Sequence, residues 1–308
     1  MPVAQPYRIK TISEFHQLLG LPRPEHPLIS VINLEGIQSL PKELSGSRTF
    51  DFYTISLKRY GYGRFNYGQQ AYDGQDGVMY FMAPGQVFSP PLKNEETNVP
   101  PMSGWALYVH PDFLWHTALA KSIKKYDYFD YSVHEALYLT EREEATIIGI
   151  LQSIQTEYFA NTDTFSQDII IALTDVLLNY ADRFYSRQFL TRKIENHQLL
   201  DRLEACLTGY FNSNDLMEHG PPSVQLVASQ LNISPNYLST LLKLLTGRTT
   251  QQHIQDKMIE KAKEKIAGTR LTVSEISYGL GVEHPQSFSR LFKAKTGLSP
   301  VEFRQSFN

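Results

Sequence analysis

The sequence of 308 residues has a single cysteine, two tryptophans and no long apolar run. Cys206 lies in an apolar helical pattern (LLDRLEACL), so the chain cannot form an internal disulfide or a cysteine metal site. We expect this thiol to be a small buried side chain rather than a redox group. The chain lacks both a basic segment followed by an apolar run at its start and any stretch of about 18 apolar residues. These absences predict a cytoplasmic protein without a membrane span.

Acidic residues are scarce only in the C-terminal part. Residues 221–308 contain 11 Lys and Arg but 6 Asp and Glu, a net charge of +5, which leaves −8 for residues 1–220. A run of positive charge is most often a solvated face, but a basic module on an acidic body also suits a nucleic-acid partner.

One short helical pattern occurs twice between Ser223 and Arg304. Each copy has a small residue where two helices must cross, then a residue that tolerates positive φ four positions later, and then a proline that opens a new helix. These positions are Ala228, Asn232 and Pro235 in the first copy and Ser277, Gly281 and Pro285 in the second. The pattern predicts two helix-turn-helix units.

The segment between the copies, Thr249 to Gly268, has no proline and no internal glycine. Ile254, Met258, Ala262 and Ile266 follow at a spacing of four, which predicts one helix with a buried stripe. Such a helix is roughly 30 Å long, close to the ~34 Å between equivalent points on successive major grooves. The two units could therefore read one face of a duplex.

Residues Glu275 to Arg304 (EISYGLGVEHPQSFSRLFKAKTGLSPVEFR) resemble the signature of the AraC/XylS transcription regulators. The chain departs from it at Ser277, where the family usually has alanine, and at Val282, where it favours phenylalanine. The resemblance implies two helix-turn-helix units joined by a long helix, and a regulator that binds double-stranded promoter DNA without a cofactor. Contact with RNA polymerase is also expected of such a regulator.

The second helix of each unit is expected to lie in a major groove. Its core positions are unavailable to DNA: Leu238, Leu241, Leu242, Phe288, Leu291 and Phe292. The predicted base contacts, which match the family's positions, are Asn236, Ser239, Thr240, Gln286, Ser287 and Arg290.

Arg290 can bind guanine through O6 and N7, and the amides of Asn236 and Gln286 can pair with adenine. The alternative for Arg290 is an ion pair with Glu275 or Glu302. The predicted phosphate contacts are Lys243, Lys293 and Lys295.

The segment from Leu28 to about Val109 is rich in β-branched and aromatic residues and is interrupted by glycine and proline. It predicts a small β-barrel and resembles the cupin-like effector domain of many AraC/XylS members. Such a barrel can hold one small molecule. Strand alternation predicts an apolar face with Tyr53, Ile55 and Leu57, and a mixed face on the other side. The mixed face could read a polar effector or simply meet water, and it carries Phe52, Thr54, Ser56, Lys58 and Tyr60. The candidate pocket residues are Phe52, Thr54, Lys58, Tyr60, Tyr80 and Trp105.

Histidine is too dispersed here for the metal site of a cupin enzyme, which needs converging ligands. His16, His26, His110, His116 and His134 are scattered, and none lies between Pro27 and Val109. No nucleophile motif or phosphate-binding glycine loop occurs either. The sequence therefore predicts no metal and no catalysis, with a cupin-type enzyme recruited to DNA by its C-terminal domain as the alternative.

Two helical patterns follow the barrel, at Glu141 to Phe159 and at Gln167 to Tyr185. The second carries a short seam of Ile170, Leu173, Leu177, Tyr180 and Phe184, which could form a homodimer or pack on its own barrel. We expect an α+β protein with an effector-sensing and dimerisation domain in residues 1–185, a hinge in 186–196 and a DNA-binding domain in 197–308.

Overall fold

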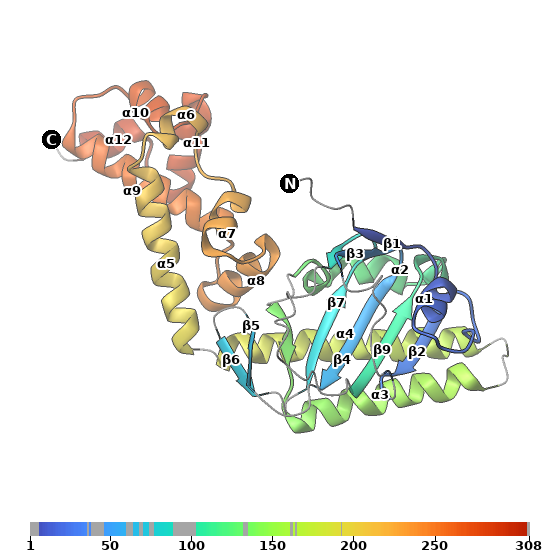
Figure 1. The fold of residues 1–308 in the computed structure, drawn as a ribbon. Coiled ribbons are helices and arrows are strands. Elements are labelled where there is room, and N and C mark those ends of the chain that lie inside the picture. Colours follow the sequence, from blue (N-terminus) through green and yellow to red (C-terminus); the bar gives the residue numbers. More distant parts are fainter. Residues whose placement is uncertain are drawn as a thin grey trace. The chain divides into compact units, whose positions relative to one another are not determined.

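The computed structural model describes residues 6–35, 37, 46–59, 64–67, 70–73, 77–88, 103–131, 135–160, 163, 165–191 and 193–306. Contacts divide the chain into two compact units, Met1–Gln188 and Phe189–Asn308. The first unit combines strands and helices, whereas the second is helical (Figure 1). This confirms a β-sheet region followed by a helical domain. The predicted hinge and domain boundaries stay a prediction.

The strands of the first unit belong to three sheets among the described residues. A five-stranded antiparallel sheet has the order β10-β7-β4-β9-β2, a three-stranded sheet has the order β1-β3-β8, and β5 pairs with β6. Closure of these sheets into the predicted barrel stays a prediction. The strands are β1 Tyr7–Ile9, β2 Ile29–Asn33, β3 Arg48–Phe50, β4 Tyr53–Arg59, β5 Arg64–Tyr67, β6 Gln70–Asp73, β7 Val78–Met82, β8 Val87–Phe88, β9 Ser103–Val109 and β10 Leu137–Tyr138.

The register of the large sheet separates its two faces. Leu57 pairs with Met79 and Trp105, while the next residue back, Ser56, pairs with Tyr80 and Ala106. Directly opposite residues share a face, and successive residues alternate. The face of Leu57 is therefore apolar, as predicted, and the face of Ser56 is mixed.

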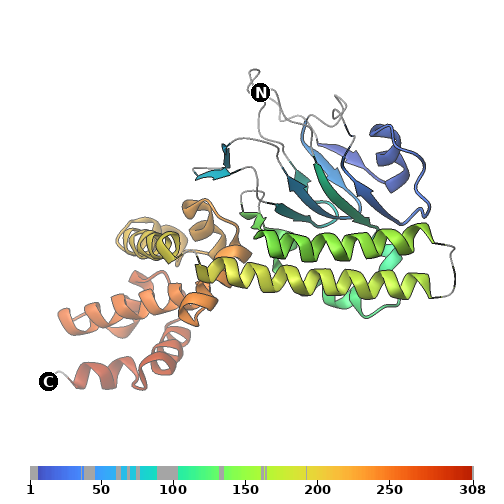
Figure 2. The same cartoon turned by 90° about the horizontal axis from the view of Figure 1, so that it is seen from below.

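Helices cover the apolar face of this sheet. In Figure 2, α3 and α4 lie side by side beneath the strands. The ring of Phe81 on β7 lies 4.5 Å from that of Tyr128 and 6.2 Å from that of Tyr185 on α4. The helical segments of this unit are α1 Ile12–Leu18, η2 Pro111–Leu114, α2 Leu119–Ser122, η3 Ile123–Lys125, η4 Asp127–Asp130, α3 Glu141–Phe159 and α4 Ser166–Thr191.

The seam predicted on α4 packs inside its own unit. Ile170, Leu177 and Phe184 are all buried, and Leu177 has no exposed surface. Of the two alternatives for this seam, the structure therefore supports packing on the subunit's own sheet. The other two residues of the seam, Leu173 and Tyr180, are half-buried.

Helix α4 is longer than the predicted span to Tyr185, because polar side chains fix its last turns. Arg187 forms an ion pair with Glu143 of α3 at 2.6 Å and donates to the carbonyl of Tyr138. The amide oxygen of Gln188 accepts from the backbone N–H of Tyr138 at 2.8 Å, and its amide nitrogen donates to Ala136. Arg187 and Gln188 therefore anchor the last turns of α4 to α3 and β10.

The second unit consists of helices only among its described residues. Cys206 on α5 is half-buried instead of fully buried, and its Sγ lies 2.9 Å from Oε1 of Gln230. Burial raises the pKa of this thiol, which keeps it protonated. The helices are α5 Lys193–Phe211, α6 Asp215–His219, α7 Val224–Leu231, α8 Pro235–Thr246, α9 Thr250–Gly268, α10 Val273–Gly279, α11 Pro285–Thr296 and α12 Pro300–Gln305.

Within the described ranges, no helix has the length and apolar character needed to cross a membrane. Nor do three or more His, Cys, Asp or Glu side chains of these ranges gather into a group that could hold a metal ion.

Candidate nucleic-acid interface

The first helix-turn-helix unit consists of α7 and α8. Asn232 ends α7 in the left-handed conformation, with φ of 59° and ψ of 41°. Ser234 caps α8, because its side chain accepts from the backbone N–H of Tyr237, and Pro235 takes the first helical position. Ala228 is fully buried at the helix crossing. The predicted turn at Asn232 and the predicted helix start at Pro235 are confirmed.

The second unit consists of α10 and α11 and has the same plan. Thr272 and Glu275 form a capping box at the start of α10, and Gly281 has φ of 72° in the turn. Ser277 is fully buried, and its hydroxyl donates to the carbonyl of Val282 at 3.0 Å. The serine that departs from the family pattern thus binds a turn carbonyl. Pro285 starts α11 after His284, which makes no side-chain capping bond.

The linker α9 presents its predicted stripe to the core of this unit. Ile254, Met258, Ala262 and Ile266 are all buried. A capping box of Thr249 and Gln252 begins the helix one residue after the predicted start. The predicted long helix is confirmed.

Helices α8 and α11 bury the positions predicted to be unavailable to DNA. Leu238, Leu241 and Leu242 on α8 and Phe288 and Phe292 on α11 are each at most 2% exposed. Leu291 on α11, the sixth of these positions, is half-buried.

The predicted base contacts differ between the two helices. Gln286, Ser287 and Arg290 are exposed on α11, whereas the three candidates on α8 are half-buried. The α8 candidates are Asn236, Ser239 and Thr240. The hydroxyl of Ser239 lies 3.0 Å from Oγ1 of Thr250, at the start of α9. Ser239 therefore also joins α8 to the linker, which its sequence position does not indicate.

The ion pair considered as the alternative for Arg290 is absent among the described residues. Both possible acidic partners cap their own helices: Glu275 accepts from the N–H of Thr272 at 2.6 Å, and Glu302 accepts from that of Ser299 at 2.7 Å. These hydrogen bonds lower the pKa of both carboxyl groups. Both side chains remain ionised and engaged, which leaves Arg290 available at the surface.

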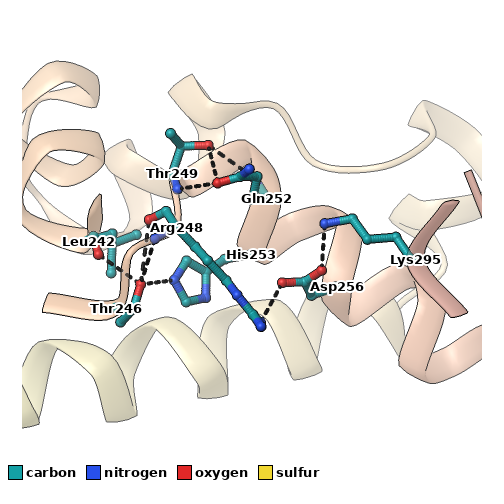
Figure 3. A network of polar contacts seen from close by, with 8 residues as sticks. All are labelled: Leu242, Thr246, Arg248, Thr249, Gln252, His253, Asp256 and Lys295. Carbon is teal, nitrogen blue, oxygen red and sulfur yellow. Dashed lines mark hydrogen bonds and ion pairs between the residues drawn. The ribbon is translucent and has the colours of Figure 1, made fainter. Parts of the chain in front are cut away.

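The three predicted phosphate contacts are not equivalent. Lys243 on α8 and Lys293 on α11 are exposed and form no ion pair with another described residue. Lys295 instead donates to Oδ1 of Asp256 at 2.8 Å, and Oδ2 of the same carboxylate accepts from Arg248 at 2.8 Å (Figure 3). Sequence reasoning missed this link, since 39 residues separate Asp256 from Lys295. The DNA roles of all nine residues stay predictions.

The candidate effector residues of the first unit do not all lie together. Thr54, Lys58 and Tyr80 share the mixed face of the sheet, and Nζ of Lys58 lies 5.7 Å from the ring centre of Tyr80. Trp105 pairs with Leu57 and belongs to the apolar face. Phe52 lies in the buried cluster with Phe15 and Phe50, and Tyr60 lies outside the described residues.

The mixed face carries the half-buried ammonium group of Lys58 and the buried hydroxyl of Thr54. Burial, aided by the charge of Arg48, lowers the pKa of Lys58 to about 8. Oγ1 of Thr54 is buried and forms no hydrogen bond within the described part of the chain. A nearby cavity, lined by Tyr80, Phe88 and Glu135 among others, measures about 20 Å³, which is room for about one water molecule. An effector pocket here stays a prediction.

Comparison with known proteins places the similarity in the second unit. Residues 227–306 match a family model described as a helix-turn-helix domain. The chain is 35% identical to the arabinose operon regulatory protein of Escherichia coli (strain K12) over 78 residues, which is 25% of this chain and 27% of that protein. It is 29% identical to an uncharacterized HTH-type transcriptional regulator of Pseudoalteromonas carrageenovora over 86 residues, 28% of this chain and 51% of that protein.

Among solved structures, the crystal structure of ToxT from Vibrio cholerae O395 aligns with 91% of this chain and 97% of its own, at 11% identity and a TM-score of 0.31. The chain spans only about a quarter to a half of the length of the two curated relatives above. The family match lies in the second unit, where it confirms the predicted resemblance.

Proposed function

From the AraC/XylS-type helix-turn-helix domain at the C-terminus, we propose that this protein is a sequence-specific regulator of transcription. The observation that carries the proposal is the pair of helix-turn-helix units on one linker, α9. Each unit presents polar side chains from the start of its second helix, which is the part that enters a major groove in such motifs. The first unit would sense a small molecule and transmit its presence to the DNA-binding domain.

An enzyme recruited to DNA is the alternative. The helix-turn-helix domain is similar to that of transcription regulators, which supports the regulator over the enzyme. A regulator of this kind would bind its small molecule and release it unchanged. Incubation of the full chain with a labelled metabolite pool separates the two functions. A retained and unaltered compound supports the sensor, whereas a new product supports the enzyme.

We expect DNA binding by the full chain to depend strongly on salt. Neutralising about six phosphates gives a slope near −5 in a plot of log affinity against log salt. Replacing Lys293 with methionine should reduce that slope by about one. The Lys295→Met change should reduce it less, because Asp256 already holds this ammonium group. Fluorescence anisotropy with a labelled duplex at several salt concentrations measures both slopes.

The two lysines are matched controls, because they lie two residues apart on α11. Equal losses of slope would show that DNA displaces Asp256 from Lys295. An affinity that does not change with salt would rule out the proposed function.

The proposal includes a homodimer, for which α4 offers a second apolar stripe. Ile169 and Val176 on α4 are 42% and 43% exposed, Phe165 just before the helix is 66% exposed, and Ala172 is exposed as well. Their spacing of four, three and four residues is that of a coiled-coil seam. A second copy of the chain with the same stripe would bury both.

We expect the double change Ile169→Glu and Val176→Glu to give a folded monomer and to weaken the dimer at least about tenfold. Leu177→Glu is the contrasting variant, because Leu177 is fully buried, and it should unfold the first unit. Analytical ultracentrifugation and circular dichroism measure the two effects. A wild-type monomer, or a double variant that stays dimeric, would mean that this stripe is not the interface.

A further inference from the structure

Asp256 joins three parts of the DNA-binding domain. It lies in the second turn of α9, and its two carboxylate oxygens bind different cations (Figure 3). Oδ2 accepts from Arg248, which lies between α8 and α9, and Oδ1 accepts from Lys295 in the last turn of α11. Through one side chain, the linker therefore holds the second recognition helix and the end of the first unit.

The corner that carries Arg248 is itself held by polar contacts. Oγ1 of Thr246 donates to the carbonyl of Leu242 at 2.7 Å, accepts from the N–H of Arg248 and lies 2.9 Å from Nε2 of His253. Burial lowers the pKa of His253, which favours its neutral form. These contacts fix the start of α9 relative to the end of α8. The ion pair of Asp256 with Lys295 therefore positions α11 relative to the first unit.

The same carboxylate also neutralises two cations. The side chain of Arg248 is 60% exposed, whereas those of Lys295 and Asp256 are each 28% exposed. Lysine and arginine that are not engaged bind phosphates of any sequence. A carboxylate between them lowers that general attraction without touching a base.

We propose that Asp256 is a specificity-determining positioning residue, which sets the relation between the two helix-turn-helix units and withholds Arg248 and Lys295 from DNA phosphates. The inference rests on the proposed DNA-binding function and adds a role for a residue that contacts no base. Two consequences are separable: the preferred spacing of the two half-sites, and the attraction to unrelated DNA.

Neutralising Asp256 should weaken the preference for one half-site spacing and strengthen the attraction to unrelated DNA. The Asp256→Asn change keeps the shape of the side chain but loses both ion pairs. Arg248 and Lys295 can then bind phosphates, so affinity for an unrelated duplex should rise about three- to tenfold and the salt slope should steepen by one to two. The units become less fixed, so the penalty for moving one half-site should fall at least about threefold.

The matched control is Glu264→Gln. Glu264 also lies on α9 and carries the same charge, but its ion pair is with Lys261 of the same helix at 2.9 Å. The Glu264→Gln change therefore alters the net charge by the same amount as Asp256→Asn. Unlike Asp256, Glu264 does not connect the two helix-turn-helix units. A second variant, Lys295→Met, breaks the tie to α11 without releasing a cation, so it should relax the spacing preference without steepening the salt slope.

The experiment uses the full chain. Wild-type protein first selects a duplex from a random library, and five base pairs, about half a helical turn, are then inserted between its half-sites. Anisotropy titrations compare both duplexes and an unrelated one for each variant, and circular dichroism confirms folding. If Asp256→Asn and Glu264→Gln behave alike in spacing and slope, the proposal is overturned. If the wild type selects no sequence, the proposed function fails first.

Discussion

Replacing Gly281 with alanine is expected to destabilise the second unit by about 2–5 kcal/mol, a large part of the 5–15 kcal/mol that stabilises a typical domain. Two effects add. The backbone has φ of +72°, where a side chain costs roughly 1–2 kcal/mol. An added Cβ would also lie 2.5 Å from Cα of Gly220 and 2.6 Å from the carbonyl oxygen of Leu216. Those are backbone atoms, so the turn or α6 would have to move, at a typical cost of about 1–3 kcal/mol or more.

Gly247 and an asparagine variant separate the two effects. Gly247 ends α8 with φ of +73°, but an added Cβ would meet nothing within 4 Å, so Gly247→Ala should cost only the roughly 1–2 kcal/mol of the backbone conformation. Asparagine tolerates positive φ, as Asn232 shows at the equivalent turn of the first unit. The Gly281→Asn change should therefore remain strongly destabilising, while Gly247→Asn should be nearly neutral.

Thermal unfolding of the full chain, followed by circular dichroism at 222 nm, measures these differences. For a unit of this size we expect Gly281→Ala to lower the unfolding temperature by roughly 10–30 °C and Gly247→Ala by about 5 °C. A Gly281→Asn protein as stable as the wild type would show that only the backbone conformation matters, and that α6 adjusts to the added side chain.

This glycine shows how far the sequence predicts the structure of the second unit. Its positive φ, the turn at Asn232 and the cap at Ser234 follow from neighbouring residues, because turns and caps are local structures. The close approach to Gly220 is between segments about 60 residues apart and leaves no periodic signal in the sequence. The second reason for a glycine at this position therefore required the structure.

The same distinction holds for the candidate sites. Burial of Leu238 and Phe288 follows from helical spacing, whereas the hydrogen bond between Ser239 and Thr250 and the ion pair between Asp256 and Lys295 depend on how helices meet. In the first unit, the sequence predicts which side chains of β4 share a face. The face to which Trp105 belongs depends on the register between β4 and β9. Register is set by pairing across the sheet, which the separate strand patterns do not determine.

The second large effect is expected at Arg290. This guanidinium is exposed on α11, and its two possible carboxylate partners are engaged in capping boxes. A bidentate contact with guanine discriminates by about 1–3 kcal/mol. Arg290→Ala should therefore weaken binding to the selected duplex by about ten- to a hundredfold and remove the preference at one base pair, with no comparable change in melting temperature.

Two further variants distinguish base reading from attraction to phosphate. Arg290→Lys keeps the charge but loses the planar pair of donors, so it should retain the salt slope and still lose the preference at that base pair. Lys243→Ala should weaken all duplexes by a similar factor and reduce the slope by about one.

Binding-site selection with each protein, followed by salt titrations on the selected duplexes, compares the four. Because the exposed candidates on α11 include an arginine and those on α8 are short, neutral and half-buried, we expect the more sharply defined half-site to be that of the second unit. An unchanged motif with Arg290→Ala, together with a lower melting temperature, would make Arg290 a structural residue. The base-reading role of α11 would then have to rest on Gln286 and Ser287.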